Sequence, residues 1–402
     1  MKKFLLVGLL AIGLWQTKAQ QVTDTNGFNQ NSAQRLLDSN KGLTIGGYGE
    51  VHYNQPISSD VQHNGKLDVH RVVILIGYNF NERTQFVSEV EYEHVSEVYI
   101  EQAFLQYKLN NSINFRGGLM LIPMGIINEY HEPTTFNGVE RPLVDNYIAP
   151  TTWREVGVGI TGNILPVSVR YQAYIVNGFN GYDGSLKFNG SNGLRKGRQK
   201  GAESYISSPN LSAKVEYFGT RGLNIGLSGY FGRSQSKAFD GLDKNDNTAG
   251  LSADSTYIGL AMLGLDARYN LGGIELRGQY YYSELSNTDK YNAFGSTNSS
   301  DYNDLGSAMM GYYVEAGYNI LKNNENTSSQ LIPFVRYEQF DTHRKVHESI
   351  TRNDAYNKTA ITTGFSWRIT QGAVVKADMQ FIKSKADSEF SKVFNAGVGV
   401  MF

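Results

Sequence analysis

The sequence predicts an all-β protein, a transmembrane antiparallel β-barrel of 16 strands with long external loops and short periplasmic turns. Three observations predict it. Apolar and polar residues alternate along most of the chain from Leu43 to Phe402. Short and long connections alternate as in outer-membrane barrels. After Gln20, no apolar run approaches the ~20 residues that a membrane-spanning helix needs.

The N-terminal residues have the order of a secretory signal. Two lysines precede an apolar run from Phe4 to Trp15, and small or short residues follow at Thr17 and Ala19. We expect cleavage after Ala19, which makes 1–19 a signal peptide. Residues 20–42, rich in Gln, Asn and Ser, are expected to form a periplasmic segment with one helical turn.

Composition excludes several other classes of protein. The chain has no cysteine, so an exported protein of this sequence cannot depend on a disulfide framework. Its net charge of -1 does not favour nucleic acid as a partner. We find no linker that divides residues 43–402, which are therefore expected to form one barrel domain.

The individual strands follow from period-two alternation and turn residues. In one segment, Ile274 and Leu276 share a face while Glu275 and Arg277 share the opposite face. The predicted strands lie near 43–53, 66–80, 84–94, 97–109, 112–122, 153–164, 166–177, 209–219, 221–232, 255–270, 272–286, 305–321, 329–342, 357–370, 372–384 and 391–402.

The connections fall into two classes. The even-numbered ones are mostly tight turns, and most odd-numbered ones are long, with short exceptions at 94–97 and 385–390. An even number of strands then places both ends of the barrel on the periplasmic side. The long connections are 54–65, 123–152, 178–208, 233–254, 287–304 and 343–356.

The final segment, KVFNAGVGVMF, alternates up to the terminal aromatic residue Phe402. This resembles the C-terminal strand that outer-membrane barrels present to their assembly machinery. We therefore expect the protein in the outer membrane of a Gram-negative bacterium, with the barrel assembly machinery, membrane lipid and lipopolysaccharide as partners.

The third external loop, 123–152, is long for a segment without strand pattern, and such loops are usually functional or disordered. Its aromatic residues, which include Tyr130, Phe136 and Tyr147, argue against disorder. Its position matches the loop that folds into 16-stranded porins and narrows them. Three short sequence motifs in and just after this loop resemble those of the phosphate-selective porin O and P family. They are formed by Asn128, Glu129, Glu132 and Pro133, by Val139, Glu140, Arg141 and Pro142, and by Pro150, Trp153, Glu155, Gly157 and Gly159.

The resemblance implies passive, substrate-biased diffusion of small solutes, with anion selectivity in the named members of that family. The basic rows that give this selectivity have no matched positions here, and the loop is acidic. The resemblance also implies homotrimers. The candidate constriction residues are Glu129, Glu132, Glu140, Arg141 and Asp145.

Alternation also places charged side chains on the inner face of the wall. An Arg or Lys that faced lipid near mid-membrane would cost about 2–4 kcal/mol, so an aqueous interior must receive these charges. Either they face an acidic loop across the pore and sort ions, or they pair between neighbouring strands and only solvate the interior. The leading wall residues are Arg170, Arg268, Arg277, Arg336, Lys376, Glu89 and Glu91.

The fourth external loop carries a basic cluster that either gathers anions at the mouth, binds lipopolysaccharide phosphates, or is simply solvated. Its members are Arg195, Lys196, Arg198 and Lys200. His343 and His347 are four residues apart but lie in a loop and lack the order of a zinc-binding helix. We predict no metal and no cofactor.

The leading functional hypothesis is a pore that passes small hydrophilic solutes or ions by passive diffusion, because barrels of 16–18 strands leave an aqueous channel. No catalytic motif appears, so we do not expect an enzyme. Two alternatives stay open. One is a surface-binding barrel, an adhesin or receptor that uses loops 178–208 and 233–254. The other is an outer-membrane hydrolase.

Overall fold

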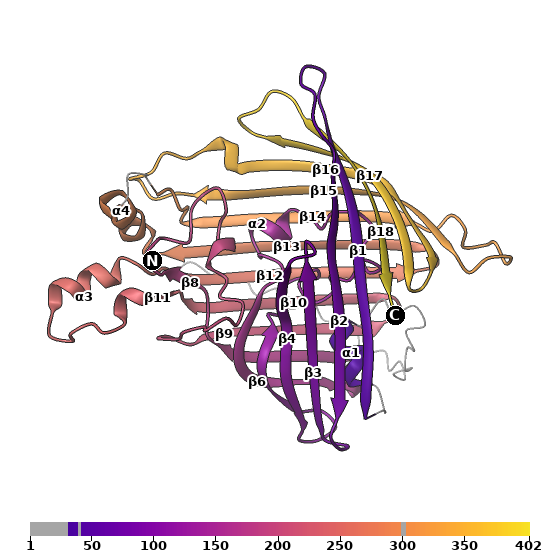
Figure 1. The fold of residues 1–402 in the computed structure, drawn as a ribbon, viewed down its shortest axis with the longest axis horizontal. Coiled ribbons are helices and arrows are strands. Elements are labelled where there is room, and N and C mark those ends of the chain that lie inside the picture. The colour runs from indigo at the N-terminus through magenta and orange to yellow at the C-terminus, as the bar shows by residue number, and fades with distance from the viewer. Residues whose placement is uncertain (1–30, 39–41, 299–302) are drawn as a thin grey trace, which may run out of the picture.

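The computed structural model describes residues 31–38, 42–298 and 303–402. Sixteen antiparallel strands close into one barrel (Figure 1). The first strand, β1 (Leu43–Ile57), pairs with the last, β18 (Ser391–Met401). The predicted fold class is therefore confirmed. The predicted signal peptide, 1–19, lies outside the described residues.

The strands lie close to the predicted ranges and follow chain order around the barrel. Two short strands in the fourth and fifth external loops, β8 (Asn180–Tyr182) and β11 (Gln235–Ser236), pair in parallel outside the barrel sheet. The other barrel strands are β2 (Lys66–Asn79), β3 (Thr84–Glu93), β4 (Glu97–Lys108), β5 (Asn114–Leu121), β6 (Arg154–Ile164), β7 (Val169–Val176), β9 (Asn210–Thr220), β10 (Leu223–Arg233), β12 (Gly259–Leu271), β13 (Ile274–Ser286), β14 (Ala308–Tyr318), β15 (Gln330–Lys345), β16 (Asn357–Thr370) and β17 (Ala373–Ser384).

The described residues also form short helices, none of which is part of the barrel wall. None of these described helices has the length and apolar character that crossing a membrane requires. They are α1 (Ser32–Leu37), α2 (Val144–Tyr147), α3 (Asn247–Asp254) and α4 (Thr288–Asn298), together with 3-10 turns at Leu165–Val167, Arg195–Gly197, Lys237–Phe239 and Asp354–Tyr356.

The tight periplasmic turns follow from residues that suit them. Between β12 and β13, Gly272 and Gly273 have φ of 67° and 83°. A two-residue hairpin with positive φ at both positions strongly favours glycine. Between β2 and β3, the Asn81 side chain accepts hydrogen bonds from the main-chain N–H groups of Arg83 and Thr84, both at 2.9 Å. These turns hold neighbouring strands in register.

The outer face of the barrel is apolar. Along β6, Val156, Val158 and Ile160 are exposed, and along β16, Phe365 and Trp367 are exposed as well. The intervening side chains point inward. An apolar belt around a whole barrel is unfavourable in water but favourable in contact with lipid. The closed sheet also leaves no strand edge with unpaired backbone groups, as a membrane requires. The protein is an outer-membrane barrel of a Gram-negative bacterium.

The interior holds two segments of the chain. The connection between β5 and β6, residues 122–153, is almost entirely buried, and we name it the inner loop. Helix α1 packs on the inner faces of β2 and β3, where Leu36 lies against Gly77. Residues 20–42 were expected to form a periplasmic segment, but the part of this segment that forms α1 enters the barrel, because Ala33 and Leu36 find apolar cover there.

Candidate functional site: the inner loop and the external cavity

The two ends of the inner loop are held together by one side chain, that of Asn128. Its Nδ2 donates to the carbonyl oxygens of Ile122 at 2.7 Å and Trp153 at 2.8 Å, and its Oδ1 accepts from the Trp153 main-chain N–H at 2.7 Å. The Trp153 ring stacks on Phe179, with centroids 4.6 Å apart. The loop therefore leaves and re-enters the wall at one fixed place.

From this base the inner loop reaches strands far around the barrel. On β17, Lys376 Nζ donates to the Gly138 carbonyl oxygen at 2.9 Å, and the Val139 N–H donates to Asp378 at 2.7 Å. Lys376 also lies 3.7 Å from the centre of the Phe136 ring. Helix α2 packs against β14 and β15. The loop thus spans the interior from β5 to β17.

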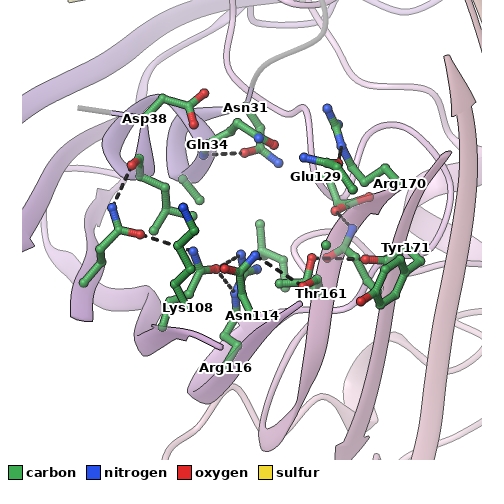
Figure 2. Close-up of a pocket in the computed structure, with 18 of the residues that line it drawn as sticks. Asn31, Gln34, Asp38, Lys108, Asn114, Arg116, Glu129, Thr161, Arg170 and Tyr171 are labelled. Atoms are coloured by element: carbon green, nitrogen blue, oxygen red, sulfur yellow. Dashed lines mark hydrogen bonds between the residues drawn. The ribbon is translucent and has the colours of Figure 1, made fainter. Parts of the chain in front are cut away.

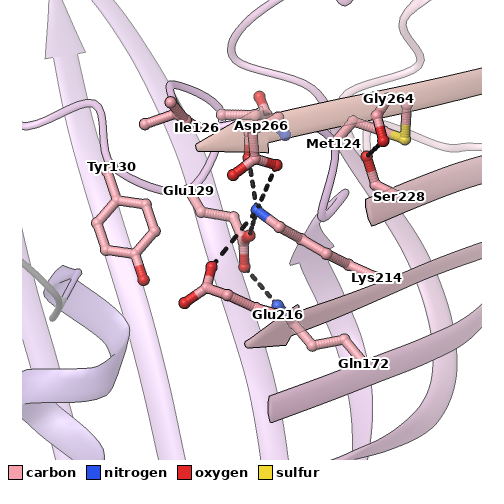
Figure 3. Close-up of polar contacts among 12 residues, drawn as sticks. Met124, Ile126, Glu129, Tyr130, Gln172, Lys214, Glu216, Ser228, Gly264 and Asp266 are labelled. Carbon is pink, nitrogen blue, oxygen red and sulfur yellow. Dashed lines mark hydrogen bonds and ion pairs between the residues drawn. The ribbon is translucent and has the colours of Figure 1, made fainter. Parts of the chain in front are cut away.

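Glu129 of the inner loop is paired with a base of the wall. Its carboxylate accepts from Lys214 Nζ at 3.1 Å and from Gln172 at 2.6 Å (Figure 3). The same ammonium group lies 3.5 Å from Asp266 and 3.9 Å from Glu216. Lys214 is almost fully buried, so the four charged groups form a compact cluster with little contact with water.

The other predicted loop carboxylates have partners too. Glu132 accepts from the Ser32 main-chain N–H of α1 at 2.6 Å. Glu140 lies 3.3 Å from His52 Nδ1 and accepts from Asn54 at 2.9 Å. Asp145 accepts from Gln279 at 2.6 Å and from the Tyr281 hydroxyl at 3.0 Å.

The predicted wall charges face inward and mostly pair with one another. Glu315 on β14 lies 3.2 Å from Arg277 and 3.4 Å from Arg336, its register partners on the two neighbouring strands. Arg170 lies 3.6 Å from Glu216, which is its register partner. This arrangement corresponds to the second of the two predicted possibilities, pairing between neighbouring strands.

Of three further wall residues, two meet the inner loop or α1, and the third, Glu91, meets another wall residue. Arg268 lies 3.9 Å from the centre of the Tyr130 ring. Glu89 accepts a hydrogen bond from the Ser32 hydroxyl. Glu91 is buried 3.9 Å from Arg71.

A cavity of about 420 Å³ lies between the inner loop and the long-loop end of the barrel. Among the described residues, five cationic side chains line it and form no ion pair. We name them the external base cluster: Arg141, Arg154, Arg195, Arg198 and Lys200. Lys196, predicted with this group, is exposed and does not line the cavity.

The fourth external loop folds inward to deliver three of these bases. Arg195 donates to the Thr151 carbonyl oxygen at 2.8 Å, and Arg198 donates to the same oxygen at 2.9 Å. Lys200 Nζ lies 4.2 Å from the centre of the Tyr99 ring. Carbonyl oxygens and an aromatic face contact these bases, and none of the bases forms an ion pair among the described residues, so an anion in the cavity could approach them directly.

The crowding of these cations changes their protonation equilibria. Burial, and after it the neighbouring Arg195, lower the pKa of Arg198 to about 9. Burial also lowers the pKa of Arg195, with Arg141 as the next cause. Burial and like charges both disfavour a charged group, and a bound anion opposes both effects.

The carboxylates of the same cavity come mainly from the wall. Glu50, Glu91, Glu93 and Glu97 lie on β1, β3 and β4, whereas the bases come from loops and the start of β6. The possibility of a transverse field was predicted with an acidic loop facing basic walls. In the external cavity the arrangement is the opposite one, with most carboxylates on the wall and most bases on the loops. Glu129 and Glu132 of the inner loop do not line this cavity and instead contact Lys214 and Ser32.

Two cavities lie on the periplasmic side of the inner loop. One, of about 300 Å³, is lined by α1 and by side chains that include Arg116, Glu129 and Arg170 (Figure 2). The other, of about 560 Å³, is lined by residues that include Arg35 and Arg368. The inner loop therefore separates solvent-accessible space at both ends of the barrel.

Arg154 was not among the predicted residues, although it stands inside the P-x-x-W-x-E pattern at a variable position. The gathering of His52, His70 and His94 at the external cavity was not predicted either. The sequence did contain a signal for His70 and His94. Asp68 and His70 share one face of a predicted strand, and His94 ends the next strand.

The class of protein now follows from the geometry: this is a closed 16-stranded outer-membrane barrel with the fold of porins. It is similar to an anion-selective porin from Comamonas acidovorans, with 12% identity, 90% of this chain and 99% of that chain covered, and a TM-score of 0.54. It is also similar to the outer membrane channel DcaP of Acinetobacter baumannii, with 12% identity, coverage of 90% and 97%, and a TM-score of 0.55. At these identities the likeness is one of fold.

In sequence, the chain belongs to the same family as an uncharacterized protein of Aquifex aeolicus (strain VF5). The two are 31% identical over 385 residues, which cover 92% of this chain and 82% of that protein. No family model matches the chain.

Proposed function

We propose that the protein is a porin that passes small hydrophilic solutes or ions by passive diffusion. The observation that carries the proposal is a closed 16-stranded barrel with solvent-accessible cavities on both sides of one internal loop. Barrels of this size leave room for an aqueous path, whereas those of about eight strands are filled by side chains. No energy-coupling element is needed for such a path.

The inner loop is the proposed constriction, and α1 is proposed to narrow the periplasmic half. Contacts of the loop with β9, β13 and β17 support this role, because they hold it across the interior rather than above the mouth. The passage is proposed to run beside the loop along β1–β4, where Arg141 and Glu140 border the external cavity.

Small anions are the proposed favoured solutes. Within the described part of the chain, five bases in the external cavity form no ion pair with a carboxylate, whereas Glu129, Glu132 and Glu140 are engaged by protein groups. Unpaired cations at a narrow entrance concentrate anions and repel cations. Phosphate, which the resemblance to the phosphate-selective porins implies, is one member of this class.

Planar-bilayer recording of the refolded protein tests both parts of the proposal. We expect stepwise conductance and, in a KCl gradient, a reversal potential of the sign that chloride permeation produces. A refolded barrel that gives no steps at any voltage contradicts the porin. Steps with a potassium-selective reversal potential contradict only the anion preference.

The folding of loop 178–208 favours the pore over a surface-binding barrel. Arg195 and Arg198 direct this loop toward the interior and bind the carbonyl oxygen of Thr151. A loop that packs into the mouth of the barrel presents less external surface to a protein or other binding partner. The hydrolase alternative has one histidine–serine contact in its favour, His347 to Ser349 at 2.9 Å, but this pair is exposed rather than in a pocket.

Four further expectations remain proposals. They are cleavage of the signal after Ala19, recognition of the strand ending at Phe402 by the assembly machinery, contact with lipopolysaccharide, and assembly into trimers. An outer membrane protein of Vibrio cholerae with this fold, OmpT, is described in a trimer form, at 13% identity and a TM-score of 0.52. Migration of the unheated protein in gels, compared with the heated protein, tests the trimer.

A further inference from the structure

Three of the seven histidines of this chain gather at the external cavity with one aspartate. His52, His70 and His94 come from β1, β2 and the turn after β3, and all three line the cavity. Asp68 precedes His70 by two residues on β2, so the two side chains share one face of the sheet. The proposed anion preference of the pore does not depend on this cluster of histidines and aspartate.

The potential ligand atoms are close enough to share one ion. Asp68 Oδ2 lies 2.8 Å from His94 Nδ1 and 3.7 Å from His70 Nδ1, and one ligand atom from each residue lies within 4.8 Å of the others. Around a tetrahedral zinc ion, with bonds of about 2.0–2.2 Å, ligand atoms stand roughly 3.3–3.5 Å apart. Small side-chain rotations would therefore bring the three atoms to coordinating distance.

The cluster is open to water on one side. The side chains of Asp68, His70 and His94 are 14%, 28% and 39% exposed. An ion can therefore enter from the external solution, and water can fill the remaining coordination position. Lys66 Nζ lies 3.5 Å from the same Asp68 oxygen, but its side chain is 69% exposed and free to swing away.

Neighbouring groups hold the two imidazole rings in place. His52 stacks on His70 with ring centroids 4.6 Å apart, and His52 is itself fixed by Glu50 at 3.2 Å and Glu140 at 3.3 Å. The His94 main-chain N–H donates to the His70 carbonyl oxygen at 3.2 Å. Such supporting contacts orient metal ligands and reduce the entropy lost on binding.

We propose that Asp68, His70 and His94 form a binding site for a divalent transition-metal ion of the Zn²⁺ type at the external rim of the barrel. Two imidazoles and one carboxylate suit Zn²⁺, Ni²⁺ and Cu²⁺. Ca²⁺ and Mg²⁺ prefer oxygen ligands alone. The bound ion places positive charge beside the acidic wall of the external cavity.

A second cluster of similar composition has a different character. Glu89, Glu101 and His131 also lie within reach of one ion, but all three are fully buried. Glu89 accepts from the Ser32 hydroxyl and His131 lies 2.9 Å from the Tyr48 hydroxyl, while one oxygen each of Glu89 and Glu101 has no hydrogen-bond partner among the described residues. The rim cluster is the accessible one.

Calorimetric titration of the untagged, refolded full-length barrel with ZnCl₂ tests the site. We expect one Zn²⁺ per chain, with an affinity at least about tenfold weaker in His94→Ala, His70→Ala and Asp68→Asn, since each removes a ligand. His63→Ala is the matched control, because His63 is exposed in the first external loop and belongs to no such cluster. CaCl₂ should give no comparable binding.

Unchanged Zn²⁺ affinity in His94→Ala and His70→Ala would overturn the proposal, as would the absence of Zn²⁺ binding to the wild-type chain. Heat-modifiable gel migration establishes that each variant is folded. The titration does not depend on solute passage, so its failure is separate from a failure of the proposed pore. As a second readout, external Zn²⁺ should change the wild-type channel current and leave that of His94→Ala unchanged.

Discussion

Charged side chains differ in their ion pairing on the two sides of the inner loop. On the periplasmic side, the buried ammonium of Lys214 is surrounded by Glu129, Glu216 and Asp266, and Arg170 is paired with Glu216. On the external side, five bases line one cavity without an ion pair among the described residues. The paired charges around Lys214 stabilise the barrel, while the external base cluster has no ion pairs among the described residues.

Burial explains this difference. Lys214 is far from bulk water, and an unpaired charge in such a place costs several kcal/mol, so opposite charges must accompany it. The external cavity opens toward the mouth, where water solvates Arg141 and Lys200 in part. Cations can stay unpaired there at lower cost, and in the proposed pore their field would reach solutes before these meet the inner loop.

The largest expected effect is on stability, and it tests the periplasmic half of the comparison. Lys214→Met leaves three carboxylates without their shared cation. We expect the free energy of unfolding to fall by about 3–5 kcal/mol, the usual cost of removing one partner of a buried ion pair. Urea unfolding of the refolded barrel in vesicles measures it.

The exposed Lys196 provides the control for that measurement. Lys196→Met should change the free energy of unfolding by less than about 0.5 kcal/mol, as is usual for surface positions. If Lys214→Met were as stable as the wild type, Glu129 and its neighbours would have to be neutral or hydrated. The contrast between paired and unpaired sides would then be lost.

The second effect concerns selectivity and tests the external half. In the variant Arg141→Gln, Arg195→Gln and Arg198→Gln, the chloride-to-potassium permeability ratio should fall roughly three- to tenfold, which corresponds to about 0.7–1.4 kcal/mol. Reversal potentials in a KCl gradient measure it. The fall should be larger near 0.1 M salt than near 1 M, where screening shortens the Debye length from ~10 Å to ~3 Å.

Lys196→Gln is the matched control, because it removes a base of the same loop that does not line the cavity. An equal change in this control would mean that the general charge of the loop, rather than the external base cluster, sets selectivity.

The third effect concerns α1, which shares the periplasmic space with the paired charges. Deletion of residues 20–38 removes this helix, and we expect single-channel conductance to rise roughly 1.5-fold because the solvent-filled cross-section widens. Leu36→Asn, which loses the contact with Gly77, should give part of the increase. Unchanged conductance in both variants would mean that α1 does not border the passage.

Much of the wall could be predicted from local signals. Period-two alternation and turn residues such as Gly272 and Gly273 act over a few neighbours, and they placed the 16 strands within a few residues. The apolar exposed face follows directly, because one residue of shift would turn every side chain to the wrong side. Register then brings Glu315 between Arg277 and Arg336.

The interior could not be predicted in the same way. Glu129 meets Lys214, 85 residues away, and Arg198 meets the Thr151 carbonyl oxygen, 47 residues away. Such contacts depend on the paths of two loops in three dimensions, which no periodicity records. The predicted possibility of an acidic loop facing basic walls differs from the external cavity, where loops supply most of the bases and the wall supplies most of the carboxylates.

The smallest expected effect concerns Glu140, which links the two halves of the comparison because it borders the external cavity while having partners. Its side chain is 35% exposed, and it contacts His52 and Asn54. Glu140→Gln keeps a hydrogen-bonding group of the same size and removes one negative charge beside Arg141. The permeability ratio should move toward anions by less than about twofold, or roughly 0.4 kcal/mol. Glu203→Gln, at an exposed position of the fourth external loop, is the control. A shift toward cations in Glu140→Gln would mean that this carboxylate positions the bases rather than weakening their attraction for anions. The external base cluster would then depend on Glu140 even though it forms no ion pair among the described residues.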